Sequence, residues 1–467
     1  MTYSAPSKTT HLGPHTRHTF GGAGARKSRN QRGARGIHAR CEGKNIAVVG
    51  LWHLGSVYAA SLAKMGFNVW GFDFDKKTAA NLKKGIPPIF EPGLEETIKK
   101  HLNKNLFFSA SEKTLKNKDY IFITHDLEVD ADDSVKTAVL EKTFSVILNS
   151  AGDSVIVISS QAPVGTSRIL VNLLKKRGIE NPQVVCFPEN LRLGTALASF
   201  LNPDRIILGS DNGEVLRQFQ NDFKFGCPVI AMGLESAEMA KHGLNVYLAT
   251  CISFASELSD LAEKTGANMA DVVKALKLEK RVSPHAPINP GLGFAGGTLG
   301  RDVQSLRKVA KGHNYEPKLL NAVYAVNRDR LPALVSKIKS VYPSLKGKTV
   351  GILGLTYKPN TNTLRRSNSL ELAAMLKEKG CRLKAFDPAI KNMITGAPYV
   401  EICKNLGAFF RDLDAIILMT DWPEFLAMDL ERLPLLMHNK IIIDTKNFLT
   451  SSEYKKRGFT YLGMGIN

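Results

Sequence analysis

The segment that most constrains the fold lies between residues 44 and 73 and reads as a strand, a glycine turn, a helix and a second strand. Residues 45–50 form a mostly apolar run, which is typical of a parallel strand buried on both faces. The helical stretch after it stops at Gly66, and the second strand, residues 68–72, ends at Asp73. This order predicts a βαβ unit of the Rossmann type.

The turn of this unit predicts an NAD site. Gly50 and Gly55 match the first and last glycines of the G-x-G-x-x-G fingerprint, and Asp73 lies where an acid would bind the ribose. Trp52 replaces the second glycine, which normally lets the backbone approach the pyrophosphate. Either the domain has lost its dinucleotide or the cofactor lies slightly further out. We favour NAD, bound by Gly50, Trp52, Leu54, Gly55 and Asp73, because a carboxylate at Asp73 would repel the extra phosphate of NADP.

The remaining pattern predicts an α/β protein with two Rossmann-like doubly wound domains joined by a central helical domain with a long spine helix. Strand-like runs recur at 119–124, 154–159, 183–186 and 205–209, and again at 348–355, 414–420 and 440–444. Residues 235–265 read as one mostly apolar helix. We expect a disordered basic extension at 1–43, an NAD domain at 44–212, a central domain at 213–330 and a C-terminal α/β domain at 331–467.

A second glycine-rich stretch, residues 291–302, suggests a ligand site. Five glycines fall within ten residues, and Thr298, Arg301 and Asp302 follow closely. Glycine at this density allows positive φ and close approach of the backbone to a ligand. The alternative is a surface loop with ordinary turn chemistry. We favour a loop that cradles substrate.

Charge and composition set further limits on partners and location. The formal net charge of +20 is partly concentrated before residue 41, in a segment without a periodic apolar face. Such a segment can contact nucleic acid or anionic lipid, but we favour a functionless extension. No apolar run reaches the ~18 residues of a membrane span, no secretory signal opens the chain, and the six cysteines lack metal-ligand spacing. These features predict a cytoplasmic protein without a metal site.

Several separate motifs across residues 44–467 resemble those of the UDP-glucose/GDP-mannose dehydrogenase family. Residues 90–94 (F-E-P-G-L) are similar to its E-P-G-L turn, and residues 187–196 (F-P-E-N-L-R-L-G-T-A) to its P-E-F-L-R-E-G-T-A. Residues 202–205 repeat its N-P-D-R, residues 355–361 resemble G-L-A-F-K-P-N-T, and residues 420–425 resemble T-E-W-x-E-F.

This resemblance implies a homodimer that oxidises the C6 alcohol of a nucleotide sugar to a carboxylate with two NAD⁺. The family's paired lysine and asparagine, which stabilise the alkoxide, match Lys241 and Asn245. Asp302 matches an aspartate beside the reacting carbon, and Glu189 matches a glutamate in acid/base work. The implied substrate-binding residues are Leu191, Arg281, Phe294, Gly296, Gly297 and Lys358.

The departures from the family pattern suggest altered chemistry. The family loop reads G-G-S-C-F-x-K-D, and its cysteine forms a thiohemiacetal with the aldehyde. This chain has Thr298 at that position, and a threonine hydroxyl is a far poorer nucleophile than a thiolate. Gln161 replaces a neighbouring threonine, and residues 122–126 (F-I-T-H-D) stand where F-I-x-V-x-T-P is usual.

We therefore predict an NAD-dependent nucleotide-sugar dehydrogenase with Lys241, Asn245, Asp302, Glu189 and Thr298 at its centre. It either stops at the aldehyde or oxidises a non-covalent hydrate. UDP-glucose is the family's commonest substrate. The alternative is a non-catalytic sensor of nucleotide sugars or dinucleotides, which Trp52 and Thr298 motivate.

Overall fold

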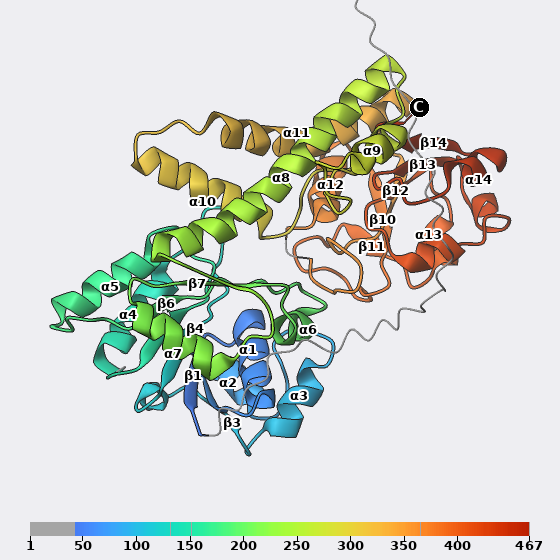
Figure 1. Cartoon of the computed structure of the whole chain (residues 1–467). Helices are drawn as coiled ribbons and strands as arrows, with labels where there is room; N and C mark the ends of the chain where they lie inside the picture. Colours follow the sequence, from blue (N-terminus) through green and yellow to red (C-terminus); the bar gives the residue numbers. More distant parts are fainter. Residues whose placement is uncertain (1–42, 131, 151, 365, 467) are drawn as a thin grey trace, which may run out of the picture. The chain divides into compact units, whose positions relative to one another are not determined.

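The computed structural model describes residues 43–130, 132–150, 152–364 and 366–466. Within these residues, the N-terminal part of the chain forms an eight-stranded sheet with the order β3-β2-β1-β4-β5-β6-β7-β8 (Figure 1). All neighbours are parallel except β6 and β7. The strands are β1(Asn45–Val49), β2(Asn68–Phe72), β3(Leu106–Ser109), β4(Tyr120–Ile123), β5(Val155–Ile158), β6(Val184–Cys186), β7(Ile206–Gly209) and β8(Val229–Met232).

Both faces of this sheet are covered, as the apolar sequence of its strands predicts. Along β1, Ile46 and Val48 pack into one hydrophobic cluster while Ala47 and Val49 pack into another. Successive residues of a strand point to opposite faces, so both faces are buried. The helices are α1(His53–Lys64), α2(Lys76–Leu82), α3(Leu94–His101), α4(Ala138–Ser150), α5(Thr166–Lys176), α6(Ala196–Leu201) and α7(Gly213–Phe223), with the 3₁₀ turn η1(Glu112–Leu115).

Four helices follow the first sheet. The spine helix predicted at 235–265 is α8(Leu234–Thr265), which ends at Gly266 with φ +75°. It is followed by α9(Met269–Leu278), α10(Leu299–Gly312) and α11(Lys318–Val341). Of these, α10 and α11 both pack against α8. The glycine-rich loop leads directly into α10, so it ends at the helix that carries Asp302.

A second, six-stranded sheet lies within residues 349–463, with the order β11-β10-β9-β12-β13-β14 and parallel neighbours. The first six strands of the N-terminal sheet have the same relative order, which is that of a Rossmann fold. The strands of this second sheet are β9(Thr349–Leu353), β10(Arg382–Phe386), β11(Val400–Ile402), β12(Ala415–Leu418), β13(Ile441–Asp444) and β14(Thr460–Gly463). Its helices are α12(Asn368–Glu378), α13(Leu406–Phe410) and α14(Ser451–Lys456), with 3₁₀ turns η2(Pro423–Ala427) and η3(Leu433–Leu436).

The elements place the expected domain boundaries inside continuous structure. The expected boundary after residue 212 precedes α7 and β8, yet β8 pairs with β7 of the first sheet. The expected boundary at residue 330 falls within α11, which continues through Pro332 to Val341. The predicted extension at 1–43 lies outside the described residues except for Gly43. Among the helices in the described ranges, none is both long and apolar enough to cross a membrane.

Candidate active site

The glycine-rich loop lines a cleft with residues from both sheets. A cavity of about 450 Å³ is bordered by Gly296, Gly297 and Thr298 of the loop, and by Lys358 from the segment after β9. An adjoining cavity of about 650 Å³ has Lys241 on its wall. The two cavities adjoin and are together called the cleft, because they share four lining residues; these are Glu189, Leu191, Arg192 and Thr298.

Asp302, in the first turn of α10, lines neither cavity but hydrogen-bonds Gln161 and Asn245, which do. It is fully buried and accepts hydrogen bonds from Gln161 Nε2 at 2.8 Å and Arg301 Nε at 3.1 Å, and a short one from Asn245 Nδ2. Burial alone would raise the pKa of this carboxyl, but the contact with His242 and the charge of Arg301 hold the pKa below its usual value. Asp302 is therefore a carboxylate held in a fixed orientation.

His242 connects α8 to this carboxylate. Its ring is 1% exposed, with Nε2 2.8 Å from the Ala162 carbonyl and Nδ1 3.3 Å from Asp302 Oδ1. A carbonyl only accepts, so Nε2 carries a proton. The Nδ1 atom then faces a carboxylate, and this contact is attractive when Nδ1 is also protonated. His242 thus ties the segment after β5 to the start of α10.

Lys241 and Glu189 form an ion pair on the wall of the second cavity. The Lys241 Nζ atom is 3.5 Å from Glu189 Oε1, and both side chains are largely buried. The other Glu189 oxygen accepts a hydrogen bond from the Leu191 backbone at 2.8 Å. Asn245 lies one turn after Lys241 on α8, so the two side chains project from the same helix face. The structure therefore brings Lys241, Asn245, Glu189 and Asp302 together.

Thr298 stands at the junction of the two cavities, immediately before the first residue of α10. Its side chain is exposed in the cleft, in the position that the resemblance gives to a cysteine. Of the five cysteines that the structure describes, none lines either cavity. The nearest in sequence to Glu189 is Cys186, which is buried, and burial raises the pKa of its thiol. A buried thiol of this kind is a poor source of thiolate.

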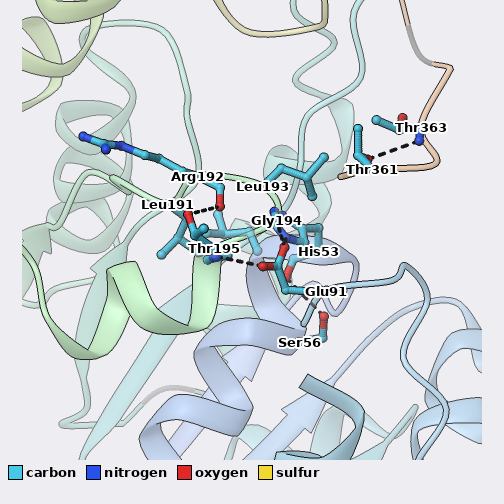
Figure 2. A network of polar contacts seen from close by, with 12 residues as sticks. His53, Ser56, Glu91, Leu191, Arg192, Leu193, Gly194, Thr195, Thr361 and Thr363 are labelled. Atoms are coloured by element: carbon cyan, nitrogen blue, oxygen red, sulfur yellow. Dashed lines mark hydrogen bonds and ion pairs between the residues drawn. The ribbon is translucent and has the colours of Figure 1, made fainter. Parts of the chain in front are cut away.

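The loop that carries Leu191 and Leu193 is held by a buried carboxylate (Figure 2). Glu91 accepts hydrogen bonds from the Gly194 and Ala196 backbones at 2.9 and 2.8 Å. It also accepts one from His53 Nε2 at 2.9 Å, at the start of α1. Lys358 then donates to the Leu193 carbonyl at 2.6 Å, and burial lowers the pKa of its ammonium. A residue of the C-terminal α/β part thus touches a loop of the N-terminal one.

The predicted cofactor residues lie together at the turn after β1. Gly50 has φ +89°, and a Cβ on Gly55 would lie 1.7 Å from the Gly50 carbonyl, so both positions require glycine. Asp73 follows β2 and accepts a hydrogen bond from the Leu51 backbone at 2.6 Å. Trp52 is 40% exposed and lines the cleft. The turn and Asp73 fit the ribose end of a dinucleotide. The Leu54 N–H, in the first turn of α1, already donates to Asp126.

Two of the predicted substrate-binding residues lie away from the cleft. Phe294 is 7% exposed, packs against residues of α8, α10 and α11, and borders a separate cavity of about 270 Å³. The Arg281 side chain is 87% exposed and pairs with Glu279. Neither side chain lines the cleft, so their substrate contacts stay predictions.

Sequence reasoning assigned no role to Gln161, His242, His125 or Asp126. Gln161, His125 and Asp126 lie in motifs that depart from the family pattern, and this departure was the signal in the sequence that could have drawn attention to them. Gln161 and His242 contact Asp302, while Asp126 contacts α1. Each contact joins segments far apart in the chain, so periodicity could not reveal it.

Comparisons with known proteins agree with this arrangement. Family models of the UDP-glucose/GDP-mannose dehydrogenase family match its NAD-binding domain at residues 44–223, its central domain at 235–329 and its UDP-binding domain at 351–451. The UDP-glucose 6-dehydrogenase TuaD of Bacillus subtilis is 33% identical over 433 residues, 90% of this chain and 93% of the relative. The UDP-glucose 6-dehydrogenase of Rickettsia bellii is also 33% identical, over 90% of this chain and 99% of its own.

A solved structure shows the same fold. The UDP-glucose dehydrogenase of Pyrobaculum islandicum superposes with a TM-score of 0.82 at 27% identity, covering 92% of this chain and 99% of that one. The predicted α/β class and the predicted class of NAD-dependent oxidoreductase are confirmed. The chain belongs to the UDP-glucose/GDP-mannose dehydrogenase family.

Proposed function

We propose that this protein oxidises an alcohol of a nucleotide sugar and does so without a covalent enzyme intermediate. The observation that carries the proposal is the cleft itself: Lys241, Asn245 and Glu189 line it, the buried Asp302 holds Asn245, and Thr298 stands where the family cysteine is expected. Because the two relatives compared above are UDP-glucose 6-dehydrogenases, UDP-glucose is the first substrate to test.

Lys241 and Asn245 supply the positive charge and the donor for the oxygen that loses its proton. NAD⁺, when bound, accepts the hydride from the carbon. The Asn245 amide has two N–H groups, and one is donated to Asp302, which fixes the direction of the other. A preorganised donor pair of this kind stabilises a developing alkoxide without reorganisation.

Glu189 is the proton acceptor in this proposal. Asp302 receives several donors that lower the pKa of its carboxyl, which makes it a weak base. Glu189 receives one backbone donor and lies 3.5 Å from Lys241, on the wall of both cavities. We infer that Asp302 positions Asn245 and Gln161, while Glu189 takes the proton.

The second oxidation requires a tetrahedral species, which a thiolate would normally provide. Thr298 is a weak nucleophile, so this step uses the aldehyde hydrate or does not occur. In the first case Glu189 takes a proton from the hydrate.

A turnover screen tests the proposed function. Nucleotide sugars are incubated with NAD⁺, NADH is followed by absorbance, and the product mass is measured. We expect NADH formation with at least one nucleotide sugar, and a loss of about 10²–10³ in kcat for Lys241→Ala. NADH formation that is equal in wild type and Lys241→Ala would contradict the assigned site.

A homodimer and a cytoplasmic location are further proposals. The homodimer is supported by four large apolar side chains on α8, which are 42–59% exposed at intervals of seven or eight residues; these are Met239, Tyr247, Phe254 and Leu261. Such spacing places them along one stripe of the helix. Light scattering of wild type against a Phe254→Glu variant tests whether a second copy covers this stripe. A variant as dimeric as wild type would contradict it.

The second candidate function is a non-catalytic sensor of nucleotide sugars. Trp52 at the glycine turn and Thr298 in the cleft favour it. Calorimetry and the turnover screen distinguish the two: binding of UDP-glucose without any binding of NAD⁺ would support the sensor, and NADH formation with any nucleotide sugar would contradict it.

A further inference from the structure

Asp126 occupies the N-terminus of α1 from a distant part of the chain. It follows β4, and its Oδ2 atom accepts a hydrogen bond from the Leu54 backbone N–H at 2.9 Å, across 72 positions of sequence. The first turn of α1 contains no acidic residue, and Trp52, which precedes it, provides no side-chain cap. Asp126 therefore supplies the negative charge that the positive end of the helix attracts.

This is the position at which a Rossmann fold binds the pyrophosphate of its dinucleotide. The phosphates bind to backbone N–H groups at the start of the helix that follows the glycine turn. The Leu54 N–H is such a group, and Asp126 lines the same cavity as Trp52 and His53. A carboxylate and a phosphate cannot accept from one N–H at the same time, and their charges repel.

The residue before Asp126 fills the space over the glycine turn. A Cβ built on Gly50 would lie 2.5 Å from His125 Nδ1, so the imidazole lies against this glycine. His125 Nε2 is 2.8 Å from Thr143 Oγ1, and the ring stacks on Phe74 at 6.2 Å. Burial lowers the pKa of His125 to about 4, so the ring is neutral near pH 7 and offers no positive charge to a phosphate.

The carboxylate of Asp126 is held at some cost. Burial raises the pKa of its carboxyl, while the Leu54 hydrogen bond and the charges of His53 and Arg301 partly offset this effect. Arg301 lines the same cavity, so a cation is available near a displaced carboxylate.

We propose that Asp126 is an internal competitor for the dinucleotide pyrophosphate, and that its carboxylate leaves the Leu54 N–H before NAD binds. This inference rests on the proposed NAD-dependent function. It assigns Asp126 as the residue that sets dinucleotide affinity in this chain, and it predicts that the turn with Gly50 and Gly55 binds NAD more weakly than it would without this carboxylate.

Calorimetry with the full chain tests the proposal on three ligands: NAD⁺, ADP-ribose and adenosine. We expect Asp126→Gly to bind NAD⁺ and ADP-ribose about tenfold or more tightly than wild type, because competitor and charge are both removed. The affinities of Asp126→Asn should lie between those of wild type and those of Asp126→Gly, because asparagine removes the charge but keeps a hydrogen-bond acceptor. Adenosine has no pyrophosphate, so its affinity should not change.

The control is Asp130→Asn, which alters an exposed carboxylate of the same loop that accepts from the Asp132 and Ser134 backbones. It should leave all three affinities unchanged. Thermal unfolding verifies that each variant is folded, and Asp126→Asn serves if the glycine variant is not. Equal NAD⁺ affinity in wild type and the Asp126 variants would overturn the proposal. Tight NAD⁺ binding by Asp126→Gly without oxidation of any nucleotide sugar would instead contradict the proposed function and leave this inference intact.

Discussion

At the scale of single residues, the cleft combines an organised set of donors with a missing nucleophile. Asp302 receives donors from three elements, and Lys241 is held beside Glu189. Fixed donors of this kind are needed for hydride transfer from an alcohol. The position for covalent catalysis holds Thr298, whose hydroxyl is a weak nucleophile near neutral pH.

The Thr298→Cys variant should restore the covalent route. We expect formation of the acid to accelerate by about tenfold or more, because a thiolate attacks the aldehyde far better than a hydroxyl. Product mass over time gives the rate. Thr298→Ser keeps a hydroxyl and should show no gain. Equal rates of acid formation in wild type and Thr298→Cys would show that the hydrate route is already efficient.

At the scale of elements, the glycine-rich loop depends on one backbone conformation. Gly293 has φ +75°, and an added Cβ would lie 2.2 Å from Asn327 Oδ1. The Asn327 amide cannot easily move, because it donates to the Phe294 carbonyl and accepts from the Phe294 backbone N–H. The loop is thus fastened to α11 before it reaches Thr298.

Gly293→Ala should lower the free energy of unfolding by roughly 2–4 kcal/mol, since it adds a strained φ and a steric overlap. Gly291→Ala is the matched control: its Cβ would approach no atom closer than 3.5 Å, and Gly291 has no positive φ. Urea denaturation compares the two variants. Similar losses would contradict a special role for the Gly293 conformation.

Glu91 makes the stability of the loop that carries Leu191 and Leu193 depend on pH. Burial would raise the pKa of its carboxyl, but the His53 contact and two backbone donors bring the pKa below the ordinary value of 4.5. A lowered pKa contributes stability that is present above pH 4.5 and is lost as pH falls below it.

Unfolding free energy should therefore decrease between pH 6 and pH 3.5, and Glu91→Gln should make this decrease smaller. The variant should also cost roughly 2–4 kcal/mol near pH 7, since a buried acceptor of three donors is altered. Urea midpoints across the pH range provide the measurement. An unchanged pH dependence in Glu91→Gln would contradict the assignment.

The sequence predicted most of the regular elements but few of the contacts between them. The apolar runs located β1 and β2 within a residue, and α8 begins one residue before its predicted start. The edge strands β8 and β11 were missed; both are partly exposed, so neither continues the buried apolar pattern by which the inner strands were predicted. The contact of Asp126 with Leu54 depends on a loop path and a rotamer, which periodicity does not encode.

At the scale of the whole chain, segments that follow strands of both sheets line one cleft. Lys358, after β9, reaches the Leu193 carbonyl, in the loop before α6. A ligand between Lys358 and Thr298 would touch both the C-terminal α/β part of the chain and the glycine-rich loop. We therefore propose that the nucleotide sugar binds on the C-terminal side of the cleft and the dinucleotide at the turn after β1.

Lys358→Ala should raise KM for the nucleotide sugar by about tenfold and leave the Kd for NAD⁺ unchanged, because a charged donor is lost on one side only. Lys404→Ala, an exposed lysine of the same part of the chain, is the control. Steady-state kinetics and calorimetry separate the two effects. A parallel loss of NAD⁺ affinity would contradict this division of the cleft.

Because Thr298 stands where a cysteine would form the covalent intermediate, the second oxidation should be slow or absent, and the ratio of NADH formed to sugar consumed measures this. With wild type and UDP-glucose, or the best substrate of the screen, we predict an initial ratio of about one, with aldehyde or its hydrate in the product mass spectrum. A rapid, clean ratio of about two from the first turnovers would contradict the account, because it would require an efficient second oxidation at a site that holds Thr298.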